Sequence, residues 1–475
     1  MSVSLPKIGL FGIGLDTYWA QFDGLKDRLE GYLSQVEGKL AAINPNIINA
    51  GLVDTTDKAF EAGQLFRQED VSLIFLYVTT YALSSTVLPV VQRAKVPVII
   101  LNLAPEAAID YENFNKMTDR TRMTGEWLSY CSACPVPEIA NVFNRTGIKF
   151  HQVTGMLHDD PTVWNDITEW LEAANVMHTM AYNRLGCMGH YYSGMLDIYS
   201  DLTAQYAHFG GHIELLEVEE LVAHRKNVTE EEAQERVTLF HKTFDVQAEC
   251  SEHDLLNAAF TSVALDKLVA EHKLGSMAYY YKGTGNVENE NAIASIILGN
   301  SLLTANGVPI AGEYEIKNAQ AMKIMDTFGA GGSFTEYYAM DFQDDVVLMG
   351  HDGPGHIAIA EGKTKVRPLG VYHGKVGSGL SVEMSVKNGA VTLLSVVEKG
   401  GKLMLLVAEA QSVAGSILQI GNTNSRYKFP IGARQFVNDW NSHGPAHHCA
   451  VGVGHTASKI EKLGALLNMV VVKVC

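Results

Sequence analysis

The chain has 475 residues, of which 47% are hydrophobic and 19% charged, a balance typical of globular proteins and not of disordered or fibrous ones. At roughly 100–200 residues per domain, this length predicts two to four domains. The 36 Lys and Arg residues against 53 Asp and Glu give a net charge of −17. This charge argues against nucleic-acid binding, because a phosphate backbone would repel such a surface.

The apolar stretches of the chain are short. The longest, residues 71–78 and 96–103, run about eight residues each, whereas a bilayer-spanning helix needs about 20. The first residues lack a basic region followed by a long apolar segment, so we expect no membrane association and no secretory signal. Six cysteines do not make a disulfide framework in a chain of this length, and a reducing cytoplasm is the simplest compartment.

The first 160 residues alternate between strand and helix patterns. Apolar runs predict strands at residues 7–11, 46–53, 71–78, 96–103 and 149–155. Periodic apolar residues and helix-forming composition predict the intervening helices at residues 18–43, 58–68, 86–94, 121–130 and 137–145. Unbroken Val, Ile and Leu strands separated by helices favour a parallel sheet covered on both faces. Residues 1–160 are therefore predicted to form a flavodoxin-like α/β domain.

A central α/β domain is predicted for residues 161–325. Helices are expected at residues 161–184, 200–208, 230–240, 252–274 and 291–305. Strands are expected at residues 212–218 and 277–281, and the Gly-rich segment 186–189 is predicted to be a turn.

The pattern changes after about residue 331. Short alternating segments separated by Gly or Asn-Gly predict antiparallel strands at residues 366–372, 379–387, 390–397, 402–410 and 416–419. Helices are expected at residues 433–440 and 456–467. The predicted fold class is α/β, with two doubly wound parallel-sheet domains followed by a β-rich barrel or sandwich at residues 326–475.

Carboxylates and histidines gather in two regions of the C-terminal third. Glu313, Glu336 and His351 lie between residues 312 and 356, and His447 and His448 follow a Gly-Pro-Ala segment. Such side chains beside apolar strands and Gly-rich bends suit a divalent metal with oxygen and nitrogen ligands. Surface carboxylates and a solvated histidine turn would give the same pattern, and no compact His-Glu-x-x-His spacing occurs.

Four segments around these residues resemble the motifs of L-arabinose isomerases, in the same order and with similar separations. They are residues 311–319 (AGEYEIKNA), 331–337 (GGSFTEY), 350–351 (GH) and 444–448 (GPAHH). The likeness extends more weakly over the whole chain, and the related L-fucose isomerases share the general architecture. The resemblance implies a cytoplasmic aldose–ketose isomerase that binds Mn²⁺, or another divalent cation such as Mg²⁺ or Co²⁺.

The resemblance also assigns roles to individual residues. It implies that the metal ligands are Glu313, Glu336, His351 and His448, and that the two glutamates are catalytic. His447 would then lie beside the metal or contact the substrate. A divalent cation lowers the barrier to moving a proton from C2 to C1 of a sugar by stabilising the developing enediolate, and carboxylates can transfer the protons. The residues do not reveal which glutamate moves the carbon-bound proton, or whether a hydride shift operates instead.

The segments expected to contact the sugar depart from the family pattern. Asp16 and Tyr18 stand near the place of a family glutamine, and Tyr81 stands in a loop where the family has a Phe. Met188 and His190, at the Gly-rich segment, would line a ligand cleft, or would equally be a packed methionine and a turn residue. We therefore expect a retained metal centre with an altered set of sugar contacts.

Other features carry less weight. The Gly12-x-Gly14 segment lacks the third glycine of a dinucleotide site, and Cys131-x-x-Cys134 has no second pair at zinc spacing. The family resemblance implies a homo-oligomer, a trimer or a hexamer, with a monosaccharide as substrate. Two alternatives remain open: an isomerase or epimerase of a different sugar on the same scaffold, and a non-catalytic sugar-binding protein.

Overall fold

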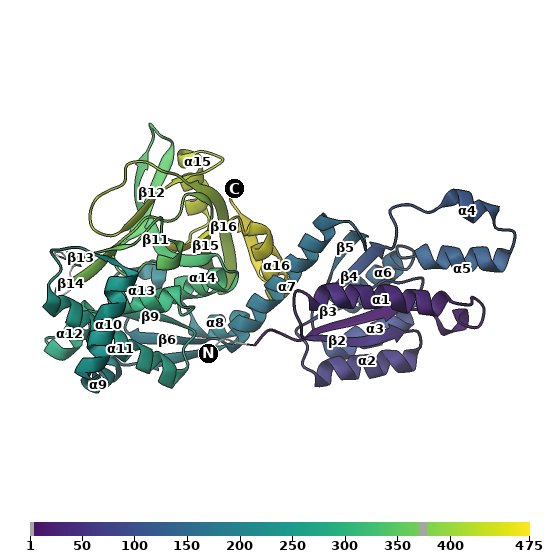
Figure 1. Ribbon diagram of the computed structural model, residues 1–475, viewed down its shortest axis with the longest axis horizontal. Coiled ribbons are helices and arrows are strands. Elements are labelled where there is room, and N and C mark those ends of the chain that lie inside the picture. The colour runs from purple at the N-terminus through teal and green to yellow at the C-terminus, as the bar shows by residue number, and fades with distance from the viewer. Residues whose placement is uncertain (1–3, 370–377) are drawn as a thin grey trace. The chain divides into compact units, whose positions relative to one another are not determined.

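The computed structural model describes residues 4–369 and 378–475 (Figure 1). These residues form two compact units, residues 4–178 and residues 179–475, which are considered separately below. The boundary falls within helix α7 (Pro161–Tyr182). The division into three domains at residues 160 and 325 stays a prediction. Among the described residues, no helix is long and apolar enough to cross a membrane.

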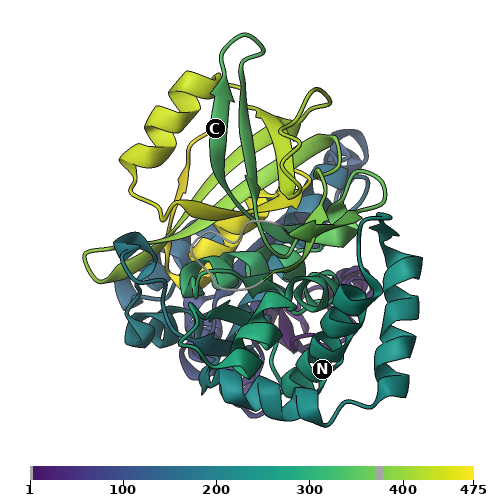
Figure 2. The ribbon, with the colours of Figure 1, turned by 90° about the vertical axis from the view of Figure 1, so that its left-hand side faces the viewer.

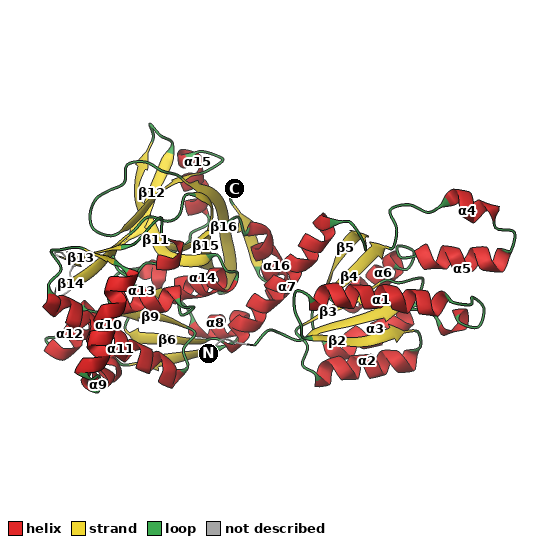
Figure 3. Cartoon of the chain, in the orientation of Figure 1, coloured by secondary structure: helices red, strands yellow, loops and turns green. Residues whose placement is uncertain are grey.

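Residues 4–178 form a five-stranded parallel sheet in the order β2-β1-β3-β4-β5, the doubly wound order of flavodoxin-like folds. Its strands are β1 (Ile8–Ile13), β2 (Ile47–Val53), β3 (Leu73–Tyr77), β4 (Val98–Ala104) and β5 (Phe150–Met156). The helices, shown in red in Figure 3, are α1 (Leu25–Ala41), α2 (Thr56–Gln68), α3 (Ser84–Ala94), α4 (Tyr111–Lys116), α5 (Arg120–Tyr130) and α6 (Val136–Thr146).

The predicted parallel α/β architecture of this unit is confirmed. Every residue of β1 and β3 is buried, which explains their unbroken apolar sequences. Helix α1 begins at Leu25 and not at residue 18, because Gly24 adopts a left-handed conformation at its N-terminus, with φ +75°. Residues Asp16–Tyr18 form a separate short 3-10 turn after β1.

Residues 179–475 begin with a second parallel sheet in the order β10-β9-β6-β7. Its strands are β6 (Arg184–Gly189), β7 (His212–Leu216), β9 (Ser276–Tyr280) and β10 (Ile310–Ala311). The helices are α8 (Leu202–Phe209), α9 (Val218–Lys226), α10 (Glu230–Thr243), α11 (Glu252–His272), α12 (Val287–Ala294), α13 (Ile297–Ala305) and α14 (Ile316–Thr327).

One local prediction for this sheet and its helices is wrong, and a predicted helix is divided in two. Residues 186–189 belong to strand β6 and do not form a turn, since all four pair with β9 and residues 186–188 also pair with β7. The predicted helix at residues 291–305 is two helices, α12 and α13, which break at Ser295. The Ser295 hydroxyl donates to the carbonyl of Asn291 at 2.8 Å, a local side-chain bond that competes with helix continuation.

The C-terminal part is a closed antiparallel barrel. Its strands are β11 (Gly331–Asp341), β12 (Val346–His351), β15 (Gly389–Lys399), β16 (Lys402–Ser412), β17 (Thr423–Lys428) and β18 (His448–Val453). The sheet order is β15-β18-β11-β12-β17-β16, and β15 also pairs with β16, which closes the ring. The β-rich C-terminal domain is therefore confirmed. In Figure 2 the β11–β12 hairpin, in green, extends above the rest of this unit.

The remaining elements lie around the barrel. Strand β19 (Val470–Lys473) joins β16 in parallel, and the helices are α15 (Ala433–Ser442) and α16 (Ala457–Leu467). The predicted strands at 366–372 and 379–387 are not barrel strands: β13 (Lys365–Leu369) and β14 (Gly379–Glu383) pair with β8 (Asp245–Val246) in a separate small sheet. Residues 370–372 lie outside the described residues. The strand predicted at 416–419 is wrong, because the chain pairs only from Thr423 onward, as β17.

Candidate functional site

The barrel brings three of the four predicted ligands together. Glu336 lies in β11, directly opposite His448 of β18 on one side and Gly350 of β12 on the other. His351 follows Gly350 at the end of β12. Directly opposed residues in an antiparallel pair have their Cβ atoms about 5 Å apart, so this register alone places Glu336 beside His448.

Glu313 reaches the same place from the parallel sheet. It follows β10, at the carboxyl edge where open α/β sheets bind ligands. Glu313 and Tyr314 both adopt left-handed conformations, with φ +58° and +64°, which non-glycine residues rarely do. The Tyr314 amide donates to the carbonyl of Tyr279 at 3.0 Å and so holds this bend against β9.

The side chains of the four residues converge. Glu313 Oε2 lies 3.4 Å from His448 Nε2, and Glu313 Oε1 lies 3.9 Å from His351 Nε2. Two overlapping groups each have their ligand atoms within 4.8 Å of one another: Glu336, His351 and His448, and Glu313, His447 and His448. His448 belongs to both groups, so a cation beside it could reach either set.

Two atoms at the centre are buried without a hydrogen-bond partner among the described residues: Glu313 Oε2 and His448 Nε2. His447 Nε2 lies 3.6 Å from Glu313 Oε2, which is beyond an ordinary hydrogen bond. Leaving a buried carboxylate oxygen and an imidazole nitrogen unsatisfied is costly unless something else binds them. A divalent cation would coordinate both atoms, and the mixed oxygen and nitrogen donor set fits such an ion.

The outer nitrogen of each candidate histidine ligand is already engaged. His448 Nδ1 lies 2.5 Å from Glu315 Oε2, and His351 Nδ1 contacts the carbonyl oxygen of Asp352. These contacts leave Nε2 of both rings directed to the centre, as in metal sites where the second ring nitrogen donates to a carboxylate or carbonyl. Phe334 packs against both rings, with centroids 4.6 Å from His351 and 4.3 Å from His448.

Burial dominates the protonation of these groups. Burial lowers the pKa of His351 and lowers that of His448 to about 3, so both rings are neutral, as metal ligation requires. Burial raises the pKa of Glu336 and raises that of Glu315 to about 8. Burial also pushes up the pKa of Glu313, but the neighbouring imidazoles outweigh it and the pKa is below the ordinary value.

The predicted sugar-contacting residues fall into different environments. His447 is exposed at the edge of the centre, and its Nδ1 lies 2.6 Å from Asp197 Oδ2. His190 is exposed after β6, where its amide donates to the carbonyl of Tyr280. Met188 is fully buried in the core, which favours packing over ligand contact at that position.

Asp16, Tyr18 and Tyr81 belong to the other unit, residues 4–178. Asp16 and Tyr18 follow β1, and Tyr81 follows β3. The strand order reverses between β1 and β3, and the carboxyl ends of strands at such a point are where doubly wound sheets bind ligands. Their contact with a sugar stays a prediction.

Three residues that contact the candidate ligands or their neighbours were not identified from the sequence. Glu315 and Lys317 lie two and four positions after Glu313 in the same segment. This alternation of charged residues after a candidate ligand is a sequence signal that could have identified them. Asp197 is 250 positions from its partner His447, and nothing in the sequence connects the two.

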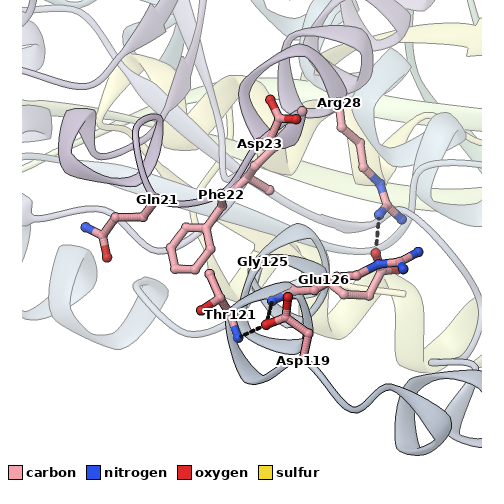
Figure 4. A pocket seen from close by; sticks show the side chains of 11 residues that line it. Gln21, Phe22, Asp23, Arg28, Asp119, Thr121, Gly125 and Glu126 are labelled. Atoms are coloured by element: carbon pink, nitrogen blue, oxygen red, sulfur yellow. Dashed lines mark hydrogen bonds and ion pairs between the residues drawn. The ribbon is translucent and has the colours of Figure 1, made fainter.

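Residues 4–178 also contain a polar cavity of about 460 Å³, shown in Figure 4. Three of its charged groups have partners: Arg28 pairs with Glu126 at 2.9 Å, and Asp119 accepts from the backbone amides of Thr121 and Arg122 at the start of α5. A much smaller cavity of about 20 Å³, room for about one water, lies beside Glu313 and His351.

Comparison with known proteins identifies the barrel. Residues 331–470 match the family model described as the L-arabinose isomerase C-terminal domain. The barrel is therefore similar to this domain. The predicted resemblance to L-arabinose isomerases is thereby confirmed, and the matched range includes Glu336, His351 and His448, while Glu313 precedes it.

Two further comparisons add little. A search among curated proteins finds no significant match to the chain. Among solved structures, the chain matches an ABC transporter periplasmic solute binding protein from Actinobacillus succinogenes 130z with bound D-allose. The sequence identity is 13%, and the match covers 65% of this chain and 95% of that chain. The TM-score of 0.17 is too low to carry an argument.

Proposed function

We propose that the chain is a divalent-metal-dependent aldose–ketose isomerase that acts on a free monosaccharide. The observation that carries the proposal is the convergence of Glu313, Glu336, His351 and His448 around two buried atoms that lack hydrogen-bond partners among the described residues. The L-arabinose isomerase domain that holds three of these residues supports it independently.

The donor set suits Mn²⁺. Two carboxylates balance the charge of a divalent cation, and two neutral imidazoles complete the coordination without adding charge. Bound there, the cation would polarise adjacent carbonyl and hydroxyl oxygens of a sugar as a Lewis acid. Mg²⁺ or Co²⁺ would supply the same chemistry.

The protein's own groups account for the proton transfers. One glutamate takes the proton from C2 and returns it to C1, while the other moves a proton between O2 and O1. The side chains of Glu313 and His351 are only 15% and 7% exposed, and burial of this kind excludes water and strengthens the interactions of the charged groups. We propose that His447, at the exposed edge, contacts a sugar hydroxyl.

Further parts of the proposal come from the family resemblance. We propose His190 and His447 as sugar contacts in a homo-oligomeric cytoplasmic enzyme. Asp16, Tyr18 and Tyr81 are proposed as further sugar contacts, and in such an oligomer Asp16 and Tyr18 would approach the metal centre of a neighbouring subunit. The altered sugar-contacting segments mean that the substrate is a monosaccharide whose identity must be found by screening.

A panel of free aldoses incubated with the protein and Mn²⁺, with ketose formation measured, tests the proposal. We expect at least one aldose to be converted, and Glu313→Gln and Glu336→Gln each to lower turnover by about 100-fold or more. Glu230→Gln, an exposed carboxylate on α10, is the matched control and should be fully active.

The other outcomes identify the alternatives. An epimer in place of a ketose would make the protein an epimerase. A protein that binds sugar but neither binds nor responds to any divalent cation would be a non-catalytic binding protein, and the proposed isomerase would be rejected.

A further inference from the structure

Asp197 is tied to two distant segments of the unit formed by residues 179–475. It lies in a 3-10 turn, η2 (Leu196–Ile198), after β6. Its Oδ2 accepts a hydrogen bond from the backbone amide of His447 at 2.9 Å and lies 2.6 Å from Nδ1 of the same residue. On the other side, Lys317 Nζ donates to the main-chain carbonyl of Asp197 at 2.6 Å.

These contacts differ from an ordinary surface ion pair. Exposed pairs contribute little because both side chains must be ordered for one contact. Here one carboxylate oxygen of Asp197 contacts both the backbone amide and the imidazole of His447. The backbone carbonyl of Asp197 in turn accepts from Lys317, a buried lysine that is 5% exposed. The side chains of Asp197 and His447 are 41% and 36% exposed, so these contacts, and not burial, restrict where the two residues lie.

The direction of the His447 ring follows from this arrangement. An ionised carboxylate can only accept hydrogen bonds, so Nδ1 of His447 carries the proton that points to Asp197. Nε2 then points the other way, 3.6 Å from Glu313 Oε2. The ring also lies against His448, with centroids 3.8 Å apart.

We propose that Asp197 is a positioning residue of the isomerase site, which holds the His447 imidazole with Nε2 directed at Glu313 and at a hydroxyl of the bound sugar. This inference rests on the proposed function. Asp197 itself is not a metal ligand and acts only through His447, and Lys317 fixes the turn that carries it.

A double-mutant cycle on the Mn²⁺-loaded enzyme tests the coupling. We expect Asp197→Ala to lower kcat by about tenfold to 100-fold, the usual effect of removing an outer carboxylate partner of a site histidine. His447→Asn should have a similar effect, and the double variant should be no worse than His447→Asn alone. Effects that multiply in the double variant would show that Asp197 acts independently of His447, and would overturn the proposal.

Two measurements exclude a merely structural role. The Tm and the Mn²⁺ affinity of Asp197→Ala, measured by calorimetry, should stay within a few degrees and about threefold of the wild type. Asp201→Asn is the matched control: Asp201 is an exposed carboxylate four positions along that accepts from the amides of Thr203 and Ala204 at the start of α8. A loss of turnover in Asp201→Asn equal to that in Asp197→Ala would mean that the whole loop, and not the Asp197 contact, is responsible.

A spectroscopic readout separates this inference from the proposed function. An imidazole Nδ1–H bound to a carboxylate gives a strongly downfield proton signal in NMR spectra of the metal-free protein. We expect one such signal to be lost in His447→Asn, lost in Asp197→Ala and retained in Asp201→Asn. If no aldose is converted, the proposed function fails while this signal still supports the contact, whereas its persistence in Asp197→Ala would overturn the positioning role.

Discussion

Substitution of Glu315 by Gln tests whether the carboxylate behind His448 controls metal affinity. Glu315 and His448 are both almost completely buried, at 1% and 1% exposed, and Oε2 lies 2.5 Å from Nδ1. When Glu315 is ionised, its carboxylate favours the imidazole form that carries its proton on Nδ1, which leaves the Nε2 lone pair for a cation. Burial raises the pKa of Glu315 to about 8 in the metal-free protein, so the Mn²⁺ affinities are to be compared above that pH. A neutral Gln oxygen can still accept this hydrogen bond, but more weakly.

The expected magnitude follows from this geometry. Loss of an outer carboxylate partner of a metal-binding histidine weakens metal affinity by about tenfold to 100-fold, or roughly 1.4–2.7 kcal/mol. Because Gln keeps an acceptor, the fold should survive. Glu315→Ala would instead leave Nδ1 unpaired in the core and lower the free energy of unfolding by about 1–3 kcal/mol.

Calorimetric titration of metal-free protein with Mn²⁺ measures the effect. Glu409→Gln is the matched control, since Glu409 is a partly buried barrel carboxylate that accepts from the amide of Ala457, away from the centre. Equal Mn²⁺ affinity in the wild type and Glu315→Gln would refute the reasoning that the Glu315 carboxylate orients His448 for the cation.

Three further predictions concern the same unit. Burial raises the pKa of Glu315 from 4.5 to about 8, so the stability that its protonated form contributes is complete below pH 4.5 and is lost as the pH rises towards 8; urea unfolding of the metal-free protein should show this loss, and Glu315→Gln should not. A Cβ on Gly350 would lie 1.8 Å from the carbonyl oxygen of Thr423, so Gly350→Ala should force β12 and β17 apart and displace His351. Calorimetry should then detect no Mn²⁺ binding, whereas an unchanged Mn²⁺ affinity would mean that the strands adapt. Mn²⁺ at 100 times its Kd should add about 2.7 kcal/mol to the free energy of unfolding, and removal with EDTA should reverse the rise in Tm; a Tm that does not respond to Mn²⁺ would contradict binding to the folded state.

The parallel sheets could be predicted because their strands are buried on both faces and read as continuous apolar runs. The same burial hides α14, whose residues from Ile316 to Met325 are all buried. Polar residues of α14, among them Lys317, Asn318 and Gln320, are buried together with its apolar ones. The three- and four-residue apolar periodicity that reveals α1 is therefore absent. Strand β17 (Thr423–Lys428) was missed for a related reason, since it is mostly polar yet buried.

The candidate ligands could be proposed from the sequence, but their arrangement could not. Glu336 and His448 are adjacent because of the register between β11 and β18, and a shift of one residue would place one of them on the opposite face. Register depends on the closed barrel as a whole, which no local segment encodes. The contact between Asp197 and His447 depends in the same way on how the parallel sheet and the barrel pack within their unit.

Glu313 shows why the position of a ligand need not follow from local preference. Two successive non-glycine residues in the left-handed region, Glu313 and Tyr314, each cost about 1 kcal/mol or more, and a sequence-based assignment would expect glycine there. Glycine at 313 would relieve the bend but remove the carboxylate. The conformation is instead held by tertiary contacts: the Tyr314 amide donates to the carbonyl of Tyr279 in β9, and the Tyr314 side chain is buried. The backbone that carries the Glu313 carboxylate is thus fixed before any cation binds. The strain is stored at the residue whose carboxylate must be held in a defined position for the proposed chemistry.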